Sequence, residues 1–129
     1  MEKNMFNTFE NGRMTANGES IDLGTLPWNP HQEFEGVYLK NVVTASQTKG
    51  AFSCHLVRIE PGKKIGMHSH PASIELHEVI SGHGTCLTGQ GDILYSPGSM
   101  AVLPMNSAHE VRAGELGLCL FAKFINIQG

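Results

Sequence analysis

Short runs of β-prone residues, separated by turn residues, make up the chain from Gly36 onward, and this pattern limits the possible folds most strongly. Turn chemistry falls at residues 49–50, 61–62, 89–91, 97–98 and 113–115, each of which contains glycine. No window of about 11 residues has a convincing helical period. Many short strands with turns at nearly regular spacing predict an all-β fold, an antiparallel sandwich or barrel.

The composition divides the chain into two parts. Residues 1–35 are rich in Asn, Gly, Thr and Glu, so we expect an N-terminal arm with one short strand at 20–23, packing on the barrel or on a partner subunit. Trp28 lies between two prolines and is expected to pack against the barrel wall or a second subunit rather than to bind a ligand. Residues 36–129 are expected to form one β-barrel domain.

Length and charge exclude several classes of protein. The chain has 129 residues and a net charge of −3 with both signs scattered, so neither nucleic acid nor an anionic membrane is an expected partner. Cys54, Cys86 and Cys119 lie far apart in no CxxC pair, which indicates free thiols in a reducing compartment. No stretch suits a signal peptide or a membrane-spanning helix, so we expect a cytoplasmic protein.

Residues 62–82 carry most of the candidate chemistry, with three histidines and two glutamates in GKKIGMHSHPASIELHEVISG. His68 and His70 are two residues apart and leave the same face of an extended chain. Together with the carboxylate of Glu75 they are a candidate metal site, and His109 is the candidate for a fourth ligand. Glu78 alternates to the outer face, where a lysine or arginine can pair with it. A one-residue slip in register would instead make Glu78 the ligand.

The spacing in this stretch resembles the first motif of the cupin family: Gly62, five residues, His68-Ser69-His70, four residues, Glu75, six residues, Gly82. A second stretch resembles the second cupin motif: Gly98, five residues, Pro104-Met105-Asn106, two residues, His109. The resemblance covers residues 50–124 and implies a jelly-roll β-barrel of the double-stranded β-helix type. It also implies one metal ion inside the barrel, bound by His68, His70, Glu75 and His109.

Two positions depart from the second motif. Asn106 stands where the motif often has glycine, and asparagine is expected to adopt the same left-handed backbone there. Ala113 stands where the motif often ends in asparagine. Cupins often pair by exchanging N-terminal arms. That resemblance, the polar arm and strand edges that need cover together lead us to expect a homodimer.

The predicted ligands suit one divalent transition metal, manganese, iron, nickel or zinc, without selecting among them. A six-coordinate ion would keep two adjacent open positions for a bidentate substrate, or for substrate and dioxygen. A tetrahedral zinc ion would be closed by four protein ligands and would then be structural.

Two further histidines are candidates for catalysis. His77 follows Glu75 by two residues and should also point inward, as a general base, a substrate hydrogen-bond donor, a partner of a metal ligand or a core histidine. His55 shares a face with Val57 and Ile59 and approaches the site if that face lines the cavity. His83, between two glycines, is expected at the surface, and His31, in the arm, is expected to be structural or exposed.

These residues support two hypotheses of different classes. The first is a metal-dependent enzyme acting on a small polar molecule, either an oxygenase or a lyase or isomerase that uses the metal as Lewis acid. His77 or His55 would then move protons. The second is a non-catalytic protein that binds or senses a small ligand. Because this kind of barrel hosts many unrelated reactions, the sequence leaves the substrate open.

Overall fold

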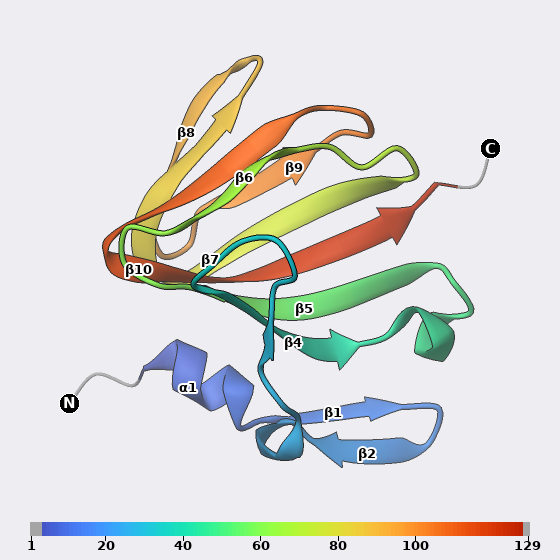
Figure 1. The fold of residues 1–129 in the computed structure, drawn as a ribbon. Coiled ribbons are helices and arrows are strands. Elements are labelled where there is room, and N and C mark those ends of the chain that lie inside the picture. The colour runs from blue at the N-terminus through green and yellow to red at the C-terminus, as the bar shows by residue number, and fades with distance from the viewer. Residues whose placement is uncertain (1–3, 128–129) are drawn as a thin grey trace.

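The structure, a computed structural model, describes residues 4–127 and is built almost entirely of antiparallel strands (Figure 1). The elements in chain order are α1 (Met5–Glu10), β1 (Arg13–Ala16), β2 (Glu19–Asp22), η1 (Leu23–Thr25), β3 (Asn29–Pro30), β4 (Val37–Val43), η2 (Ala45–Thr48), β5 (Phe52–Ile59), β6 (Lys64–His68), β7 (Ser73–Thr88), β8 (Gly91–Tyr95), β9 (Met100–Leu103) and β10 (His109–Asn126). The predicted all-β jelly-roll fold is confirmed. Within residues 4–127, no helix is long and apolar enough to cross a membrane.

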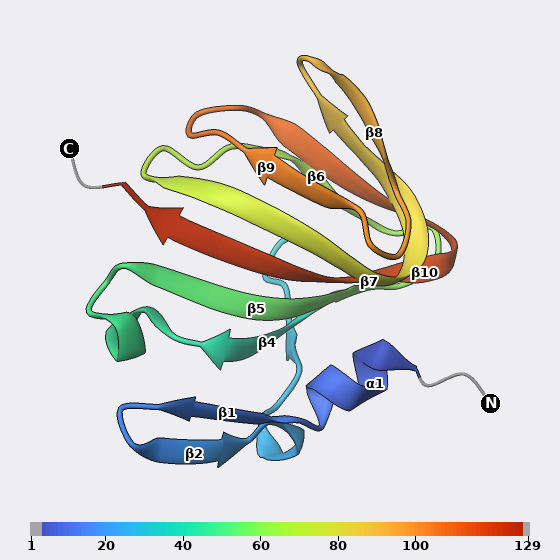
Figure 2. The same ribbon diagram turned by 180° about the vertical axis from the view of Figure 1, so that it is seen from behind.

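The strands of the barrel form two layers, and two long strands, β7 and β10, each contribute one half to each layer. The first half of β7 pairs with β9 and its second half with β8. The first part of β10 pairs with β6, and its last part pairs with β5. Figures 1 and 2 show the layers converging at the end where these two strands bend. The long strands therefore join the layers without a loop.

Glycines make the bend possible. A Cβ atom on Gly82 would lie 2.2 Å from the carbonyl oxygen of Gly117, and one on Gly84 would lie 2.1 Å from that of Arg112. The prediction of a turn at 113–115 that separates two strands is wrong, because β10 continues through it and its register with β7 shifts between Ala113 and Leu118. Glycine there permits a bulge and a bend instead of a chain reversal.

The inward faces of the strands differ between the two ends of the barrel. At one end they are apolar and buried, and Val57, Val79 and Leu120 pack there in one cluster. Toward the other end, alternation brings polar residues to the same faces: Glu75 and His77 lie two residues apart and are both buried. The apolar half thus supports a polar half, where the candidate site lies.

The arm packs on the outside of β4 and β5, below them in Figure 1. Helix α1 begins after Asn4, whose side chain accepts hydrogen bonds from two backbone N–H groups of its first turn. Phe6 and Leu23 pack with Val42 and Leu56 in a second buried cluster. The strand expected at 20–23 is found as β2, in a hairpin with β1, whereas α1 was not expected.

Two contacts attach the arm to the barrel. The buried Lys40 donates from Nζ to the carbonyl oxygens of Glu10 and Leu23, at 2.9 and 2.8 Å. The Trp28 ring of the arm lies against two cations of the barrel, 5.3 Å from Lys40 Nζ and 4.8 Å from the Arg58 guanidinium. Trp28 therefore packs against the barrel wall. An additional contact of the arm with a partner subunit stays a prediction.

Candidate metal centre

The four predicted ligands come from three strands and one loop, and the structure brings them together. His68 ends β6, His109 begins β10, and the two residues are partners in the antiparallel pairing of these strands. Glu75 lies near the start of β7, and His70 lies in the loop between β6 and β7. One candidate ligand atom from each of the four side chains lies within 4.8 Å of the other three.

Backbone carbonyl groups set the orientation of two of these imidazoles. His68 Nδ1 lies 2.7 Å from the carbonyl oxygen of Gly66, and His109 Nδ1 lies 3.0 Å from that of Ser107. A carbonyl oxygen only accepts, so both Nδ1 atoms carry the proton. When these two rings are neutral, each Nε2 therefore carries no proton and presents a lone pair, as a metal ligand requires.

The polar atoms that face the centre of the cluster lack hydrogen-bond partners. Glu75 Oε1 lies 3.0 Å from His109 Nε2 and 3.4 Å from His70 Nε2. Neither pair has hydrogen-bond geometry, and all three atoms are buried without a partner. A carboxylate oxygen and an unprotonated imidazole nitrogen repel each other at such a distance unless a cation lies between them. The donor set and its orphaned atoms therefore fit a metal ion.

The second oxygen of Glu75 is held by a buried chain of hydrogen bonds. His77 Nε2 lies 2.6 Å from Glu75 Oε2, and His77 Nδ1 lies 2.8 Å from the Tyr95 hydroxyl. An ionised Glu75 can only accept, so His77 donates from Nε2, and in the tautomer that carries this one proton Nδ1 accepts from the Tyr95 hydroxyl. The chain leaves Oε1 free to face the cluster. The sequence analysis missed Tyr95. The one signal for it was that a tyrosine in a strand needs a polar partner when it is buried.

The charges of the cluster follow from this geometry. Burial alone would raise the pKa of Glu75, but the nearby His109, His70 and His77 side chains lower it well below its usual range. Glu75 is therefore ionised at neutral pH. Burial lowers the pKa of His68, so that ring stays neutral. Burial also opposes a charge on His109, but Glu75 raises the pKa of His109 above its usual value.

His55 lies on the inner face of β5 and lines a pocket beside the cluster. The centroid of its ring lies 5.6 Å from that of the Phe124 ring. The centroid of the Phe124 ring in turn lies 5.0 Å from that of the His70 ring. Both nitrogens of His55 have partners, since Nδ1 lies 2.8 Å from Asn41 Oδ1 and Nε2 lies 3.1 Å from Ser53 Oγ. One aromatic ring therefore stands between His55 and the cluster.

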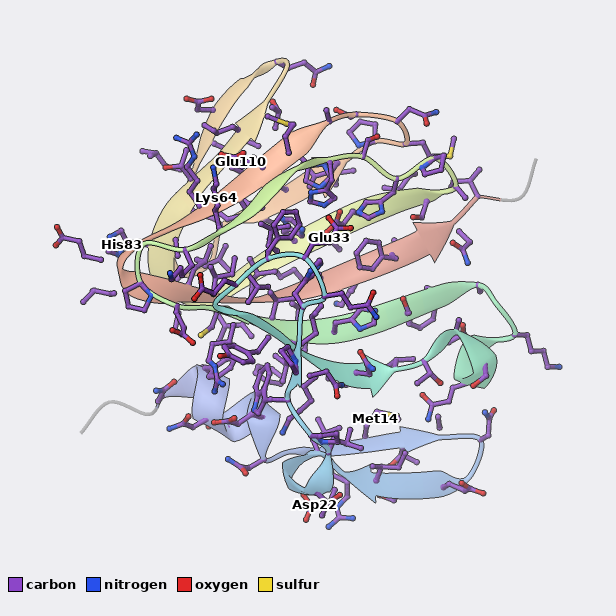
Figure 3. All side chains as sticks on the ribbon, in the orientation of Figure 1. Met14, Asp22, Glu33, Lys64, His83 and Glu110 are labelled. Carbon is purple, nitrogen blue, oxygen red and sulfur yellow. The ribbon has the colours of Figure 1, made fainter. Side chains whose placement is uncertain are left out.

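The remaining predictions about side chains have clear outcomes. Glu78 lies on the outer face with Lys123 Nζ at 2.5 Å, as predicted, so the register selects Glu75 for the interior. His83 is exposed and lies at the edge of the molecule in Figure 3. The three cysteines are free, and Cys54 and Cys86 are buried.

Comparison with protein families assigns the chain. The model of the cupin domain family matches residues 55–118, a range that holds all four clustered residues. The chain contains a cupin domain. A search of curated protein sequences found no significant match.

Solved structures of cupin-like proteins share this fold at low sequence identity. A predicted oxalate decarboxylase from Thermotoga maritima has a TM-score of 0.75 at 15% identity and covers 88% of this chain and 100% of its own. A polyketide cyclase from Streptomyces resistomycificus has a TM-score of 0.73 at 14% identity, covering 85% and 80% of the two chains. A sugar phosphate isomerase of the cupin superfamily from Silicibacter pomeroyi has a TM-score of 0.68 at 18% identity, covering 83% and 75%. At these identities the similarity shows the fold alone.

The second cupin motif has the backbone that was predicted for its asparagine. Asn106 has a positive φ of 63°, so asparagine makes the left-handed turn where glycine is usual, as expected. Its backbone N–H donates to the carbonyl oxygen of His70 at 2.9 Å. The second cupin motif thereby holds the loop of the first. That the four clustered residues bind a metal ion stays a prediction.

Proposed function

We propose that this cupin is a metal-dependent enzyme that acts on a small polar molecule at the polar end of its barrel. The observation that carries the proposal is the group of buried, unpartnered atoms of His70, Glu75 and His109 that face one another. Such a group is costly to bury unless a cation occupies it. The proposal therefore begins with the metal, and the reaction follows from what surrounds it.

The ligands we propose are Nε2 of His68, His70 and His109 and one oxygen of Glu75. A divalent transition metal bound there would supply Lewis-acid polarisation of a substrate oxygen. The groups of the protein around it would orient the ligands and transfer protons. Ser107 and Gly66 keep the imidazole lone pairs aimed inward.

His77 and His55 are given different roles by their contacts. His77 is buried and uses both ring nitrogens, on Glu75 and Tyr95, so we assign it to positioning the carboxylate. His55 borders the pocket, and its Nε2 contacts the Ser53 hydroxyl. A pair of this kind can pass a proton between a bound molecule and the hydroxyl. We therefore assign His55 to proton transfer in the pocket.

A non-catalytic ligand-binding or sensor function is the alternative, and one observation favours it. Both ring nitrogens of His55 and of His77 already have partners. Within residues 4–127 these two histidines therefore offer no free base beside the cluster. A His55→Gln variant that keeps ligand binding but loses turnover supports the enzyme. Tight ligand binding without turnover in the wild type supports the sensor.

The proposal includes a cytoplasmic homodimer that binds no nucleic acid. The free thiols support the cytoplasm, and the scattered charges argue against nucleic acid as a partner. The homodimer rests on the resemblance to cupins and on strand edges that need cover. A mass close to that of a single chain, measured by light scattering, would remove the dimer from the proposal.

The first test is the metal content of the untagged protein, measured by plasma mass spectrometry. We expect close to one divalent transition ion per chain, lost in a His68→Ala/His109→Ala variant. A His83→Ala variant removes an exposed imidazole outside the cluster and is expected to keep the metal. A wild-type protein that is free of metal and cannot be reloaded would refute the ligand assignment and the enzyme together.

A further inference from the structure

A pocket lined by both polar and apolar groups opens beside the cluster, and its chemistry indicates what kind of molecule it accepts. Its volume is about 340 Å³, within the range of roughly 300–1,000 Å³ typical of small-molecule sites. One wall is a strap, residues 29–34, that precedes β4, and the other wall consists of inward residues of β4 and β5. The lining residues are Asn29, Pro30, His31, Gln32, Glu33, Leu39, Asn41 and His55.

The strap reaches across to the strand that carries His68. At its tip, the Phe34 ring lies so close to Gly66 of β6 that a Cβ atom there would meet it at 2.8 Å. The centroid of the Phe34 ring lies 4.8 Å from that of His31 and 6.5 Å from that of His68, and the rings are tilted in both pairs. On the other side, the Phe124 ring links His55 to His70. On each side, a single aromatic ring, Phe34 or Phe124, thus lies between the pocket and the cluster.

The pocket offers hydrogen-bond donors that have no partner among residues 4–127. His31 Nδ1 accepts from the backbone N–H groups of Glu33 and Phe34, so the ring is neutral and its proton is on Nε2. Asn41 Oδ1 accepts from His55, which leaves the amide NH₂ of Asn41 as a donor. Leu39 and Pro30 add apolar surface. Donors, acceptors and short apolar patches together suit a molecule rich in hydroxyl groups.

The pocket carries no positive charge to attract an anion. No lining residue is lysine or arginine, and the carboxylate of Glu33 is the one full charge among them. Burial lowers the pKa of His55 and keeps that ring neutral as well. A phosphate or carboxylate group placed here would face Glu33 without a counter-charge. Figure 3 shows Glu33 in the strap, in front of the sheets.

From these observations we propose that the pocket binds an uncharged, hydroxyl-bearing part of the substrate and rejects anionic groups. The proposal rests on the proposed function, in which a metal-binding group of the same molecule would lie at the cluster. His31 and Asn41 would recognise hydroxyl groups, His55 would report the bound molecule from the adjoining wall, and Glu33 would set the charge selectivity. Glucose and myo-inositol are therefore suitable neutral probes, and glucose 6-phosphate differs from glucose only by its charged group.

The test follows the imidazole signals of the full, zinc-loaded chain by nuclear magnetic resonance while each probe is added. We expect glucose and myo-inositol to shift the signals of His31 and His55 and to leave the exposed His83 unchanged. Glucose 6-phosphate should need a concentration at least roughly fivefold higher for the same shifts. In a Glu33→Gln variant this difference should fall to about twofold or less. Glu35→Gln is the matched control, because Glu35 pairs with Lys63 and does not line the pocket.

Two results would overturn the inference: equal or tighter binding of glucose 6-phosphate by the wild type, or no shift of His31 and His55 with either neutral probe. A metal titration of the same samples separates this failure from that of the proposed function. If the cluster binds metal while the pocket ignores the sugars, the ligand class is wrong and the metal enzyme stands. If no metal binds, the enzyme proposal fails whatever the pocket does.

Discussion

Replacing Tyr95 by phenylalanine removes one oxygen atom from the interior and isolates the hydrogen-bond chain behind Glu75. The tyrosine is buried, and its hydroxyl is 2.8 Å from His77 Nδ1. Without that donor, the buried nitrogen has no partner, which costs about 1–3 kcal/mol of folding free energy. For a domain of this length, the melting temperature should fall by roughly 3–12 °C.

The same substitution should weaken metal binding through Glu75. With its donor gone, the His77 ring loses the contact that fixes its orientation, so its Nε2–H is held less firmly against Glu75 Oε2. Loss of a partner of a metal ligand typically lowers metal affinity about 10–100-fold, or about 1.4–2.8 kcal/mol. The assay is competition between the protein and a coloured chelator for cobalt, whose absorption spectrum also reports the ligand geometry. The melting temperature of the metal-free variant measures the structural effect separately.

A Tyr38→Phe variant is the matched control, because this tyrosine lies on β4 against the Arg58 guanidinium, at 5.0 Å, outside the cluster. It should keep both cobalt affinity and spectrum. If Tyr95→Phe loses stability but binds cobalt as the wild type does, the hydroxyl stabilises the core without orienting Glu75. If neither property changes, the inferred chain of donors is wrong.

Three further perturbations test the fold around the site. Gly84→Ala should cost about 3 kcal/mol or more in urea unfolding, since its Cβ would lie 2.1 Å from the Arg112 carbonyl oxygen, whereas Gly89→Ala, with nothing within 4 Å, should be nearly neutral. Lys40→Met should lose about 1.5–3 kcal/mol and make the arm sensitive to limited proteolysis, because Nζ no longer binds two carbonyl oxygens of the arm; unchanged proteolysis would contradict that anchor. Burial raises the pKa of the Cys54 thiol to about 11, so its alkylation in the native protein at pH 8 should be at least about a hundredfold slower than that of an ordinary thiol. Because this folded-state pKa lies above the unfolded value, the associated stability is complete below about pH 9 and is lost as pH rises toward 11.

Local patterns in the sequence were enough to predict the fold class, and the resemblance to the two cupin motifs supplied the members of the cluster. Period-two alternation places His68 and His70 on one face and separates Glu75 from Glu78, and both features depend only on neighbouring residues. Turn chemistry is equally local, so the left-handed backbone of Asn106 was predictable. No local pattern links His109 to residues 68–75, so that member of the set came from the resemblance to the second cupin motif.

The tertiary structure decided what depends on partners distant in the chain. Read from the sequence alone, a glycine indicates a turn. Only the close approach of β7 to β10 shows that the glycines here allow a bend within one continuous strand. Tyr95 reaches His77 across 18 residues through strand register, which no local pattern encodes. The helix of the arm is shorter than an isolated helix can be and exists because Phe6 is buried against the barrel. Sequence thus determined which atoms could bind a metal, and packing decided which other side chains hold those atoms in place.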